Sequence, residues 1–207
     1  MDVQVCDAQS DIVLATRAGM SIRFHQGDAR EMGRATTGVK GIELSKGDQV
    51  IGMVVVRREA TLLVVSEKGY GKRSELAEYR VQKRGGKGII TFKVTEKTGS
   101  IVALKEVIPE DELMMITRQG VIIRVPVDGI RVIGRNTQGV KVMNLDQGDT
   151  VVDVAPVVKE DSSEARKRAA WAISRASPKR PMGMWTRRRW RFSSVSRYFI
   201  SSSVRRG

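Results

Sequence analysis

The chain has 207 residues and a formal net charge of +14, from 37 Lys and Arg against 23 Asp and Glu. One cysteine and one histidine exclude an internal disulfide framework and a cysteine–histidine metal cluster, and no apolar run approaches the roughly 20 residues that a membrane helix needs. Most of the excess charge lies in residues 159–207, where 14 side chains are basic and 3 are acidic, so residues 1–158 are nearly neutral. We therefore expect a cytoplasmic protein without a signal peptide, in which affinity for nucleic acid depends on where the charges of the first 158 residues lie.

The first 158 residues repeat one pattern three times, in predicted units at 11–56, 61–107 and 112–158. In each unit, two apolar runs divided by a turn glycine are followed by a loop with glycine and basic residues, a second turn and a last apolar run. Four sets of equivalent positions are separated by 50 and then by 51 residues: Gly19, Gly69 and Gly120; Arg23, Arg73 and Arg124; Arg34, Arg84 and Arg135; Gly38, Gly88 and Gly139. Four positions that keep this spacing through three copies indicate an internal repeat.

Each unit is predicted to consist of strands. Turn residues interrupt the apolar runs at 17–19 and 46–48 in the first unit, at 68–69 in the second and at 147–149 in the third. Four short strands in about 50 residues are typical of a propeller blade. The sequence therefore predicts an all-β array of three four-stranded, propeller-like blades.

The beginning of the chain also fits the repeat. Val3–Val5 matches Met53–Val55, the last apolar run of the first unit, at the same 50-residue spacing. Three blades are fewer than the roughly four to eight that close a propeller. We therefore expect this chain to be the C-terminal part of a longer protein.

The loop Gln82–Gly88 of the second unit has three cations and three glycines within seven residues. Glycine lets the backbone approach a phosphate closely, and Arg and Lys supply the charge that binds it. The loop is not a P-loop, because the G-x-x-x-x-G-K-[ST] pattern is missing. A solvated glycine-rich turn whose charges serve solubility is the alternative interpretation.

The position of this loop in the repeat favours phosphate binding. The equivalent loops also carry an arginine and a following lysine, and a second set of arginines follows the first turn of each unit. Blades packed side by side would repeat these cations along one rim, and such a line of contacts binds duplex DNA by its backbone and bends it without reading its sequence. The predicted DNA-binding residues are Gln82, Lys83, Arg84, Gly85, Gly86, Lys87, Gly88, Arg34, Lys40, Arg135, Lys141, Arg23, Lys72, Arg73 and Arg124.

Residues 2–158 resemble the C-terminal DNA-wrapping domain of the bacterial DNA gyrase A protein, a β-pinwheel of propeller-like blades. The segments that carry the resemblance are Gly19–Phe24, Met32–Ile42, Gly69–Arg73, Gln82–Gly88 and Gly134–Lys141. The loop Gln82–Gly88 is similar to the box that this family uses to wrap DNA. In the family the defining box lies in the first of usually six blades. These three units look like the last three, which makes this loop a later copy of the box.

The resemblance implies a DNA-binding and DNA-wrapping module of a type II topoisomerase, which supports ATP-dependent negative supercoiling in the parent complex. The implied partners are duplex DNA, the upstream breakage-reunion region and the gyrase B protein, with no membrane, in the bacterial cytoplasm at the chromosome. No cofactor is expected in this chain, since ATP and magnesium are used elsewhere in the parent complex. The family's catalytic tyrosine lies upstream, and Tyr70, Tyr79 and Tyr198 lack its context. We therefore expect no enzymatic activity from this chain on its own.

Two alternatives remain at this point. One is the corresponding domain of topoisomerase IV, which lacks an intact box, so Gln82–Gly88 argues against it. The other is a propeller-like scaffold for protein partners that does not bind DNA. Residues 159–207 continue no repeat and are rich in Ser and Arg. We expect this basic tail to be disordered. It serves either as a nucleic-acid-binding arm or as an extension without function, or it is translated in a shifted frame beyond the end of the domain.

Overall fold

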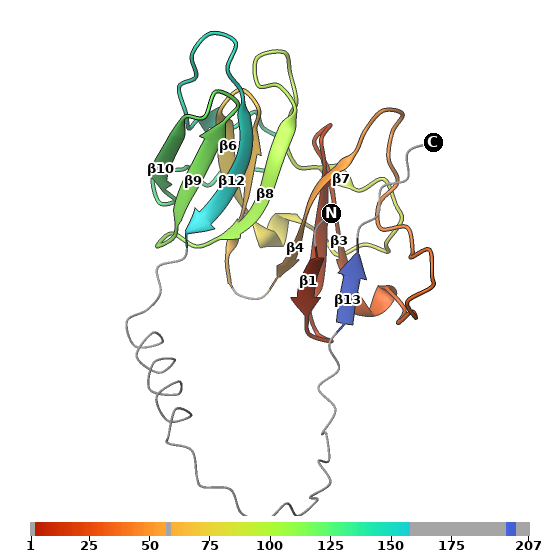
Figure 1. Ribbon diagram of the computed structural model, residues 1–207. Coiled ribbons are helices and arrows are strands. Elements are labelled where there is room, and N and C mark those ends of the chain that lie inside the picture. Colours follow the sequence, from red (N-terminus) through yellow and green to blue (C-terminus); the bar gives the residue numbers. More distant parts are fainter. Residues whose placement is uncertain (1–2, 57–58, 158–197, 202–207) are drawn as a thin grey trace, which may run out of the picture. The chain divides into compact units, whose positions relative to one another are not determined.

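The computed structural model describes residues 3–56, 59–157 and 198–201 (Figure 1). These residues form strands and two 3-10 turns, and among them no helix is long and apolar enough to cross a membrane. The strands are β1 Val3–Cys6, β2 Asp11–Thr16, β3 Met20–His25, β4 Val50–Val56, β5 Thr61–Ser66, β6 Tyr70–Glu75, β7 Ile89–Ile90, β8 Ile101–Val107, β9 Glu112–Thr117, β10 Ile122–Pro126, β11 Val140–Lys141, β12 Val151–Val157 and β13 Tyr198–Ser201. The 3-10 turns are η1 Gln26–Asp28 and η2 Leu76–Glu78. The predicted all-β fold is confirmed.

Three antiparallel sheets correspond to the three repeats. Their strand orders are β4-β2-β3-β7, β8-β5-β6-β11 and β12-β9-β10. In each repeat the first two strands form a hairpin, and its turn glycine has a positive φ, for example +95° at Gly19. The last long strand of each repeat then pairs with the first one.

The fourth strand of a sheet comes from the next repeat along the chain, which the repeat pattern alone does not show. β7 of the second repeat pairs with β3 of the first, and β11 of the third repeat pairs with β6 of the second. The third sheet has three strands among the described residues. The three repeats are therefore joined by exchanged strands as well as by packed sheets.

The central strand β5 explains how the sheets share a core. All six of its residues are buried, and successive side chains in a strand point to opposite faces. Leu62 and Val64 belong to a core cluster of the second repeat that also contains Val13 and Ala15 of the first repeat. Leu63 and Val65 pack with a cluster that contains buried residues of β9 and β12. Full burial of a Val or Leu side chain contributes about 1.5–3 kcal/mol, so this strand stabilises both junctions.

The chain outside the three sheets is described only in part. β1 pairs antiparallel with β13, and Gln4 Nε2 donates to Met53 O of β4 at 2.7 Å. Residues 158–197 and 202–207 lie outside the described residues, so the prediction of a disordered tail stays a prediction for them. The four residues Tyr198–Ser201 form a strand.

Candidate nucleic-acid interface

The loop Gln82–Gly88, here called the box loop, docks on the first repeat. Gln82 N donates to Arg23 O at 2.8 Å, and Gly85 N donates to Gly41 O at 2.6 Å. The Gln82 side-chain nitrogen is buried, without a hydrogen-bond partner in the described part of the chain. The glycines of the box loop thus let its backbone meet the neighbouring repeat, in addition to any role toward phosphate.

The arginine of the box loop crosses the same junction. Arg84 Nε donates to Asp28 O at 2.7 Å, and Arg84 Nη1 donates to Lys40 O at 3.0 Å. At the next junction Arg135 Nη1 donates to Ile90 O, also at 3.0 Å. Because Ile90 is the repeat equivalent of Lys40, both arginines make the same contact. This contact explains the regular spacing of these arginines without DNA.

The arginines of β3 and β6 contact the repeat that follows, whereas Arg84 and Arg135 contact the repeat that precedes. Arg23 forms an ion pair with Asp11, 2.6 Å between Nη2 and Oδ2, and donates to Leu76 O of the second repeat at 2.9 Å. Arg73 is 6% exposed, and its Nε donates to Ile130 O of the third repeat at 2.8 Å. Both guanidinium groups are therefore held by the protein, and as arranged here they are poor candidates for phosphate contacts.

The two arginines at the ends of the array differ from the others. Arg34 precedes the first junction and Arg124 follows the last, so neither has a neighbouring repeat to cross to among the described residues. Both side chains are exposed, and Arg124 is ion-paired with Glu112 of its own sheet. The same repeat position thus contacts the neighbouring repeat at a junction and is exposed at an end.

Lys72 is a further predicted cation that the fold uses internally. Its ammonium group donates to Gly134 O at 2.6 Å, to Thr137 Oγ1 at 3.1 Å and to Arg135 O, and it lies 5.9 Å from the ring centre of Phe92. The side chain is fully buried. Lys72 thus holds the loop of the third repeat rather than a ligand.

Burial lowers the pKa of Lys72 from 10.5 to about 8, against the carboxylate of Glu78, which raises it. Between pH 8 and 10.5 the unfolded chain keeps a proton that the folded chain has lost, so unfolding takes up a proton and becomes less favourable as the pH rises. We expect the unfolding free energy of the native chain, relative to Lys72→Met, to rise by about 1–2 kcal/mol between pH 7.5 and 9.5. Urea denaturation of both proteins at the two pH values measures this. If the difference in unfolding free energy between the two proteins is the same at both pH values, the lowered pKa of Lys72 is contradicted.

Four predicted lysines remain exposed to solvent: Lys40, Lys83, Lys87 and Lys141. Lys83 and Lys87 belong to the box loop, and the backbone of Lys40 contacts the same loop through Arg84. Lys141 occupies the position of Lys40 in the third repeat. None of the four ammonium groups forms a hydrogen bond or an ion pair with another described residue. These side chains keep their full capacity to bind phosphate.

A third set of arginines was missed by the sequence prediction. Arg30, Arg80 and Arg131, here called the third arginine column, have the same 50- and 51-residue spacing, and all three are exposed. Their side chains make no ion pair or hydrogen bond with the rest of the described chain. The next residues Val81 and Val132 form parallel bridges with the second strand of the preceding repeat, so Arg80 and Arg131 lie beside the junctions. The repeat spacing alone could have identified this column.

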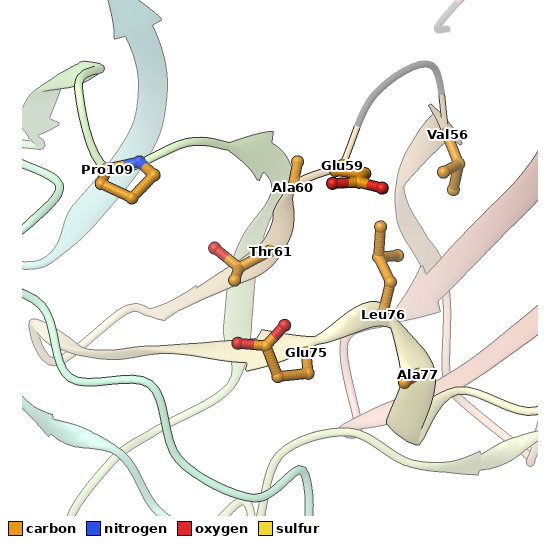
Figure 2. A pocket seen from close by; sticks show the side chains of 8 residues that line it. All are labelled: Val56, Glu59, Ala60, Thr61, Glu75, Leu76, Ala77 and Pro109. Carbon is orange, nitrogen blue, oxygen red and sulfur yellow. The ribbon is translucent and has the colours of Figure 1, made fainter.

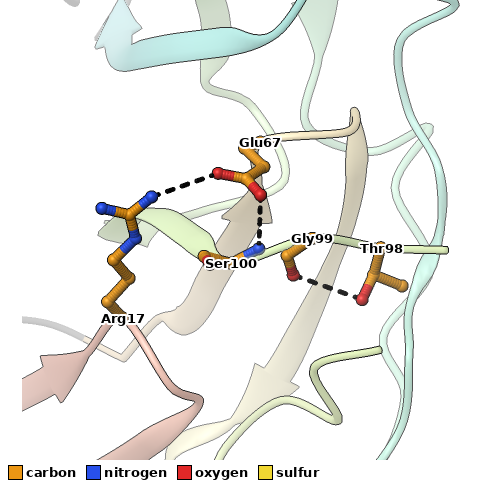
Figure 3. A network of polar contacts seen from close by, with 5 residues as sticks. All are labelled: Arg17, Glu67, Thr98, Gly99 and Ser100. Carbon is orange, nitrogen blue, oxygen red and sulfur yellow. Dashed lines mark hydrogen bonds and ion pairs between the residues drawn. The ribbon is translucent and has the colours of Figure 1, made fainter. Parts of the chain in front are cut away.

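A further junction contact involves charge but offers no binding site. Figure 3 shows Arg17 of the first repeat beside Glu67 of the second, with 3.5 Å between Nη2 and Oε2. Glu67 Oε1 also accepts from Ser100 N at 3.1 Å, and the nearby Thr98 hydroxyl donates to Gly99 O. The Arg17 side chain is half exposed and that of Glu67 about a quarter, 50% and 26%, and solvent-exposed pairs contribute about 0–1 kcal/mol.

A pocket of about 730 Å³ lies between β4, β6 and the segment before β5 (Figure 2). Among the described residues, its lining contains two carboxylates and no basic side chain: Val56, Glu59, Ala60, Thr61, Glu75, Leu76, Ala77 and Pro109. Phosphate would be repelled by Glu59 and Glu75. The described lining therefore does not favour phosphate binding.

Comparison with known proteins agrees with this arrangement. The family model of the DNA gyrase C-terminal domain, a beta-propeller, matches residues 10–57, 60–107 and 111–157. The DNA gyrase A protein of Haloquadratum walsbyi is 47% identical over 169 residues, which cover 80% of this chain and 20% of that protein. The DNA gyrase A protein of Mycolicibacterium smegmatis is 42% identical over 161 residues, covering 77% of this chain and 19% of that protein. The chain thus spans about a fifth of the length of these relatives.

Two solved structures have the same fold. The C-terminal domain of DNA gyrase A matches with a TM-score of 0.70 at 28% identity, over 74% of this chain and 52% of that one. The C-terminal domain of DNA topoisomerase IV matches with a TM-score of 0.76 at 22% identity, over 83% of this chain and 54% of that one. The sequence relatives named here are gyrase A proteins, and the family model covers all three repeats. The chain therefore belongs to the family of DNA gyrase A C-terminal domains.

Proposed function

We propose that this chain binds duplex DNA along its consecutive repeats and bends it, as the DNA-wrapping part of a DNA gyrase A protein. In the parent complex it would present a DNA segment for strand passage, together with the breakage-reunion region and the gyrase B protein. ATP and magnesium would act in those other parts. The reaction itself would not involve side chains of this chain.

This proposal rests on one observation: some of the repeated cations are held by the protein itself, and others are exposed to solvent. The arginines at the junctions are held by backbone carbonyls and carboxylates, whereas Lys83, Lys87 and the third arginine column are exposed without protein partners among the described residues. Exposed cations that recur once per repeat match a ligand with regularly spaced negative charge. Duplex DNA, with one charge per about 1.7 Å of axis, is such a ligand.

The two other hypotheses are less well supported. The topoisomerase IV structure matches at lower sequence identity than the gyrase A structure, and the box loop is nearly complete. A protein-binding scaffold gives no reason for three exposed arginines at equivalent positions. It predicts that removal of exposed box-loop charge leaves DNA affinity unchanged.

The box loop is tested by salt-dependent binding of the full chain to a linear duplex. We expect Lys83→Gln with Lys87→Gln to make the plot of log affinity against log salt shallower by about 2, since each lost phosphate contact removes close to one released counterion. Fluorescence anisotropy at several salt concentrations measures the slope.

The matched control replaces two other exposed lysines, Lys46→Gln with Lys97→Gln, on the turns that precede β4 and β8. It removes the same charge outside the box loop and should change the slope by much less. Equal slopes for the two variants would show that DNA affinity depends only on the net charge of the chain. In that case the box loop has no specific part in binding.

A further inference from the structure

The pocket of Figure 2 lies where the second repeat differs from its two neighbours. In the first repeat, Gln26 N donates to Ser10 O at 3.0 Å, which joins the start of the 3-10 turn to the residue before β2. In the third repeat, Val127 N donates to Asp111 O, also at 3.0 Å. Gln26 and Val127 are both buried. One hydrogen bond thus closes the corresponding end of both repeats.

The second repeat lacks the equivalent bond. Leu76 N and Ala60 O occupy the same positions, but they form no hydrogen bond with each other or with another described residue. Leu76 is only half-buried, and Figure 2 shows its side chain extending from the end of β6 toward Val56 and Glu59. Both Leu76 and Ala60 line the pocket. The lining therefore includes a backbone donor and a backbone acceptor that the other two repeats use for their own closure.

Two carboxylates supply the charge of the pocket. Glu59 and Glu75 are exposed, and neither carboxylate forms an ion pair or a hydrogen bond within the described part of the chain. At the position of Glu75 the first repeat has His25 and the third has Pro126, so this carboxylate is not a feature of the repeat. Unpaired carboxylates attract a cation and repel an anion. The charge of the pocket therefore favours a cationic ligand.

The rest of the lining is mostly apolar, and the space is large. Besides the two glutamates and Thr61, the described lining residues are Val56, Ala60, Leu76, Ala77 and Pro109, and the volume is about 730 Å³. Small-molecule sites typically have about 300–1,000 Å³, an apolar lining and a few polar groups that fix the orientation of the ligand. One arginine side chain of a partner protein would fill only part of such a space. A small molecule with an apolar body and a cationic end fits it better.

We propose that this pocket is a binding site for a small organic cation, a guanidinium or amidinium group on an apolar body. The planar cation donates to the carboxylates of Glu59 and Glu75, as guanidinium groups do in bidentate ion pairs. Val56, Leu76 and Pro109 pack against the apolar body. The site uses none of the cations assigned to DNA, and the proposal does not depend on DNA binding.

The test is a titration of the full chain with benzamidine, a planar amidinium on an apolar ring, in the absence of DNA. Chemical-shift changes in proton–nitrogen NMR spectra measure the affinity. We expect saturable binding by the native chain and at least about tenfold weaker binding by Glu59→Gln with Glu75→Gln, because the charge-assisted hydrogen bonds to carboxylate are lost. Benzamide, a neutral analogue of similar shape, should also bind at least about tenfold more weakly than benzamidine.

A second variant tests the space rather than the charge. Ala77→Phe keeps both carboxylates and fills part of the pocket, so it should weaken benzamidine binding at least about fivefold. Ala77 is exposed, so the fold should tolerate the larger side chain. The matched charge control is Glu31→Gln with Glu96→Gln, which removes two exposed carboxylates outside the pocket and should bind like the native chain. Circular dichroism and thermal melting of each protein verify that the fold is kept.

Four results would overturn the proposal. The first is that the native chain shows no saturable binding of benzamidine, and the second is that the two double variants bind it equally well. The third is that benzamide binds as tightly as benzamidine, or that Ala77→Phe leaves the affinity unchanged. The fourth is that a capped Gly-Arg-Gly peptide binds more tightly than benzamidine, since the pocket would then recognise an arginine of a protein partner.

Discussion

Gly88→Ala should lower the unfolding free energy by about 3 kcal/mol or more. Gly88 has a φ of +76°, and a Cβ at this position would lie 2.2 Å from Ser21 O of the first repeat. A non-glycine residue at positive φ costs about 1–2 kcal/mol, and a clash with a fixed backbone atom adds about 1–3 kcal/mol. The clash also opens the junction at which β7 pairs with β3. Urea denaturation of the full chain measures the loss.

Gly38→Ala is the matched control for this prediction. Gly38 is the equivalent glycine of the first repeat, with a φ of +80°, and a Cβ there would meet no atom within 4 Å. We expect it to cost about 1 kcal/mol, from the backbone conformation alone. If the two variants lose the same stability, the box loop does not dock on the first repeat as described.

Replacing the third arginine column should have the largest effect on DNA. Arg30→Gln, Arg80→Gln and Arg131→Gln together should make the salt dependence of duplex binding shallower by about 3, one for each phosphate contact. The unfolding free energy should change by less than about 0.5 kcal/mol for each substitution, because these side chains form no hydrogen bond or ion pair with a described residue. Anisotropy titrations and urea denaturation of the same protein give both values.

The junction arginines should behave in the opposite way. Arg73→Gln removes the donor to Ile130 O inside the fold and should cost about 1.5–3 kcal/mol, with little change in the salt slope. If instead Arg73→Gln flattens the slope and the third arginine column has no effect, the two sets of arginines have been assigned the wrong roles.

Much of the fold could be predicted from the sequence, because equivalent residues of the three repeats recur at a regular spacing. Gly19, Gly69 and Gly120 mark equivalent hairpin turns, and the apolar runs around them became the strands of three sheets. The exchange of β7 and β11 between repeats could not be predicted. These strands have two residues each, and their pairing depends on how neighbouring sheets pack, which a single repeat does not encode.

The candidate site was predicted less completely for a related reason. A basic residue that recurs in every repeat can bind an external phosphate or an internal carbonyl, and its spacing is the same in both cases. Arg73 and Lys72 are buried and Arg23 is held by Asp11 and by the second repeat, which only the structure reveals. Lys83 and Lys87 are exposed as expected for DNA-binding residues, and their role toward DNA stays a prediction.

The central claim, that DNA is bent along the repeats, is tested most directly by topology. A nicked circular DNA is incubated with the full chain and ligated, and the linking number of the closed product is measured after the protein is removed. We predict a shift that grows with protein concentration and is lost when the third arginine column and the two box-loop lysines are replaced by glutamine. DNA that is bound at the same concentrations but closes with an unchanged linking number would contradict wrapping by this chain.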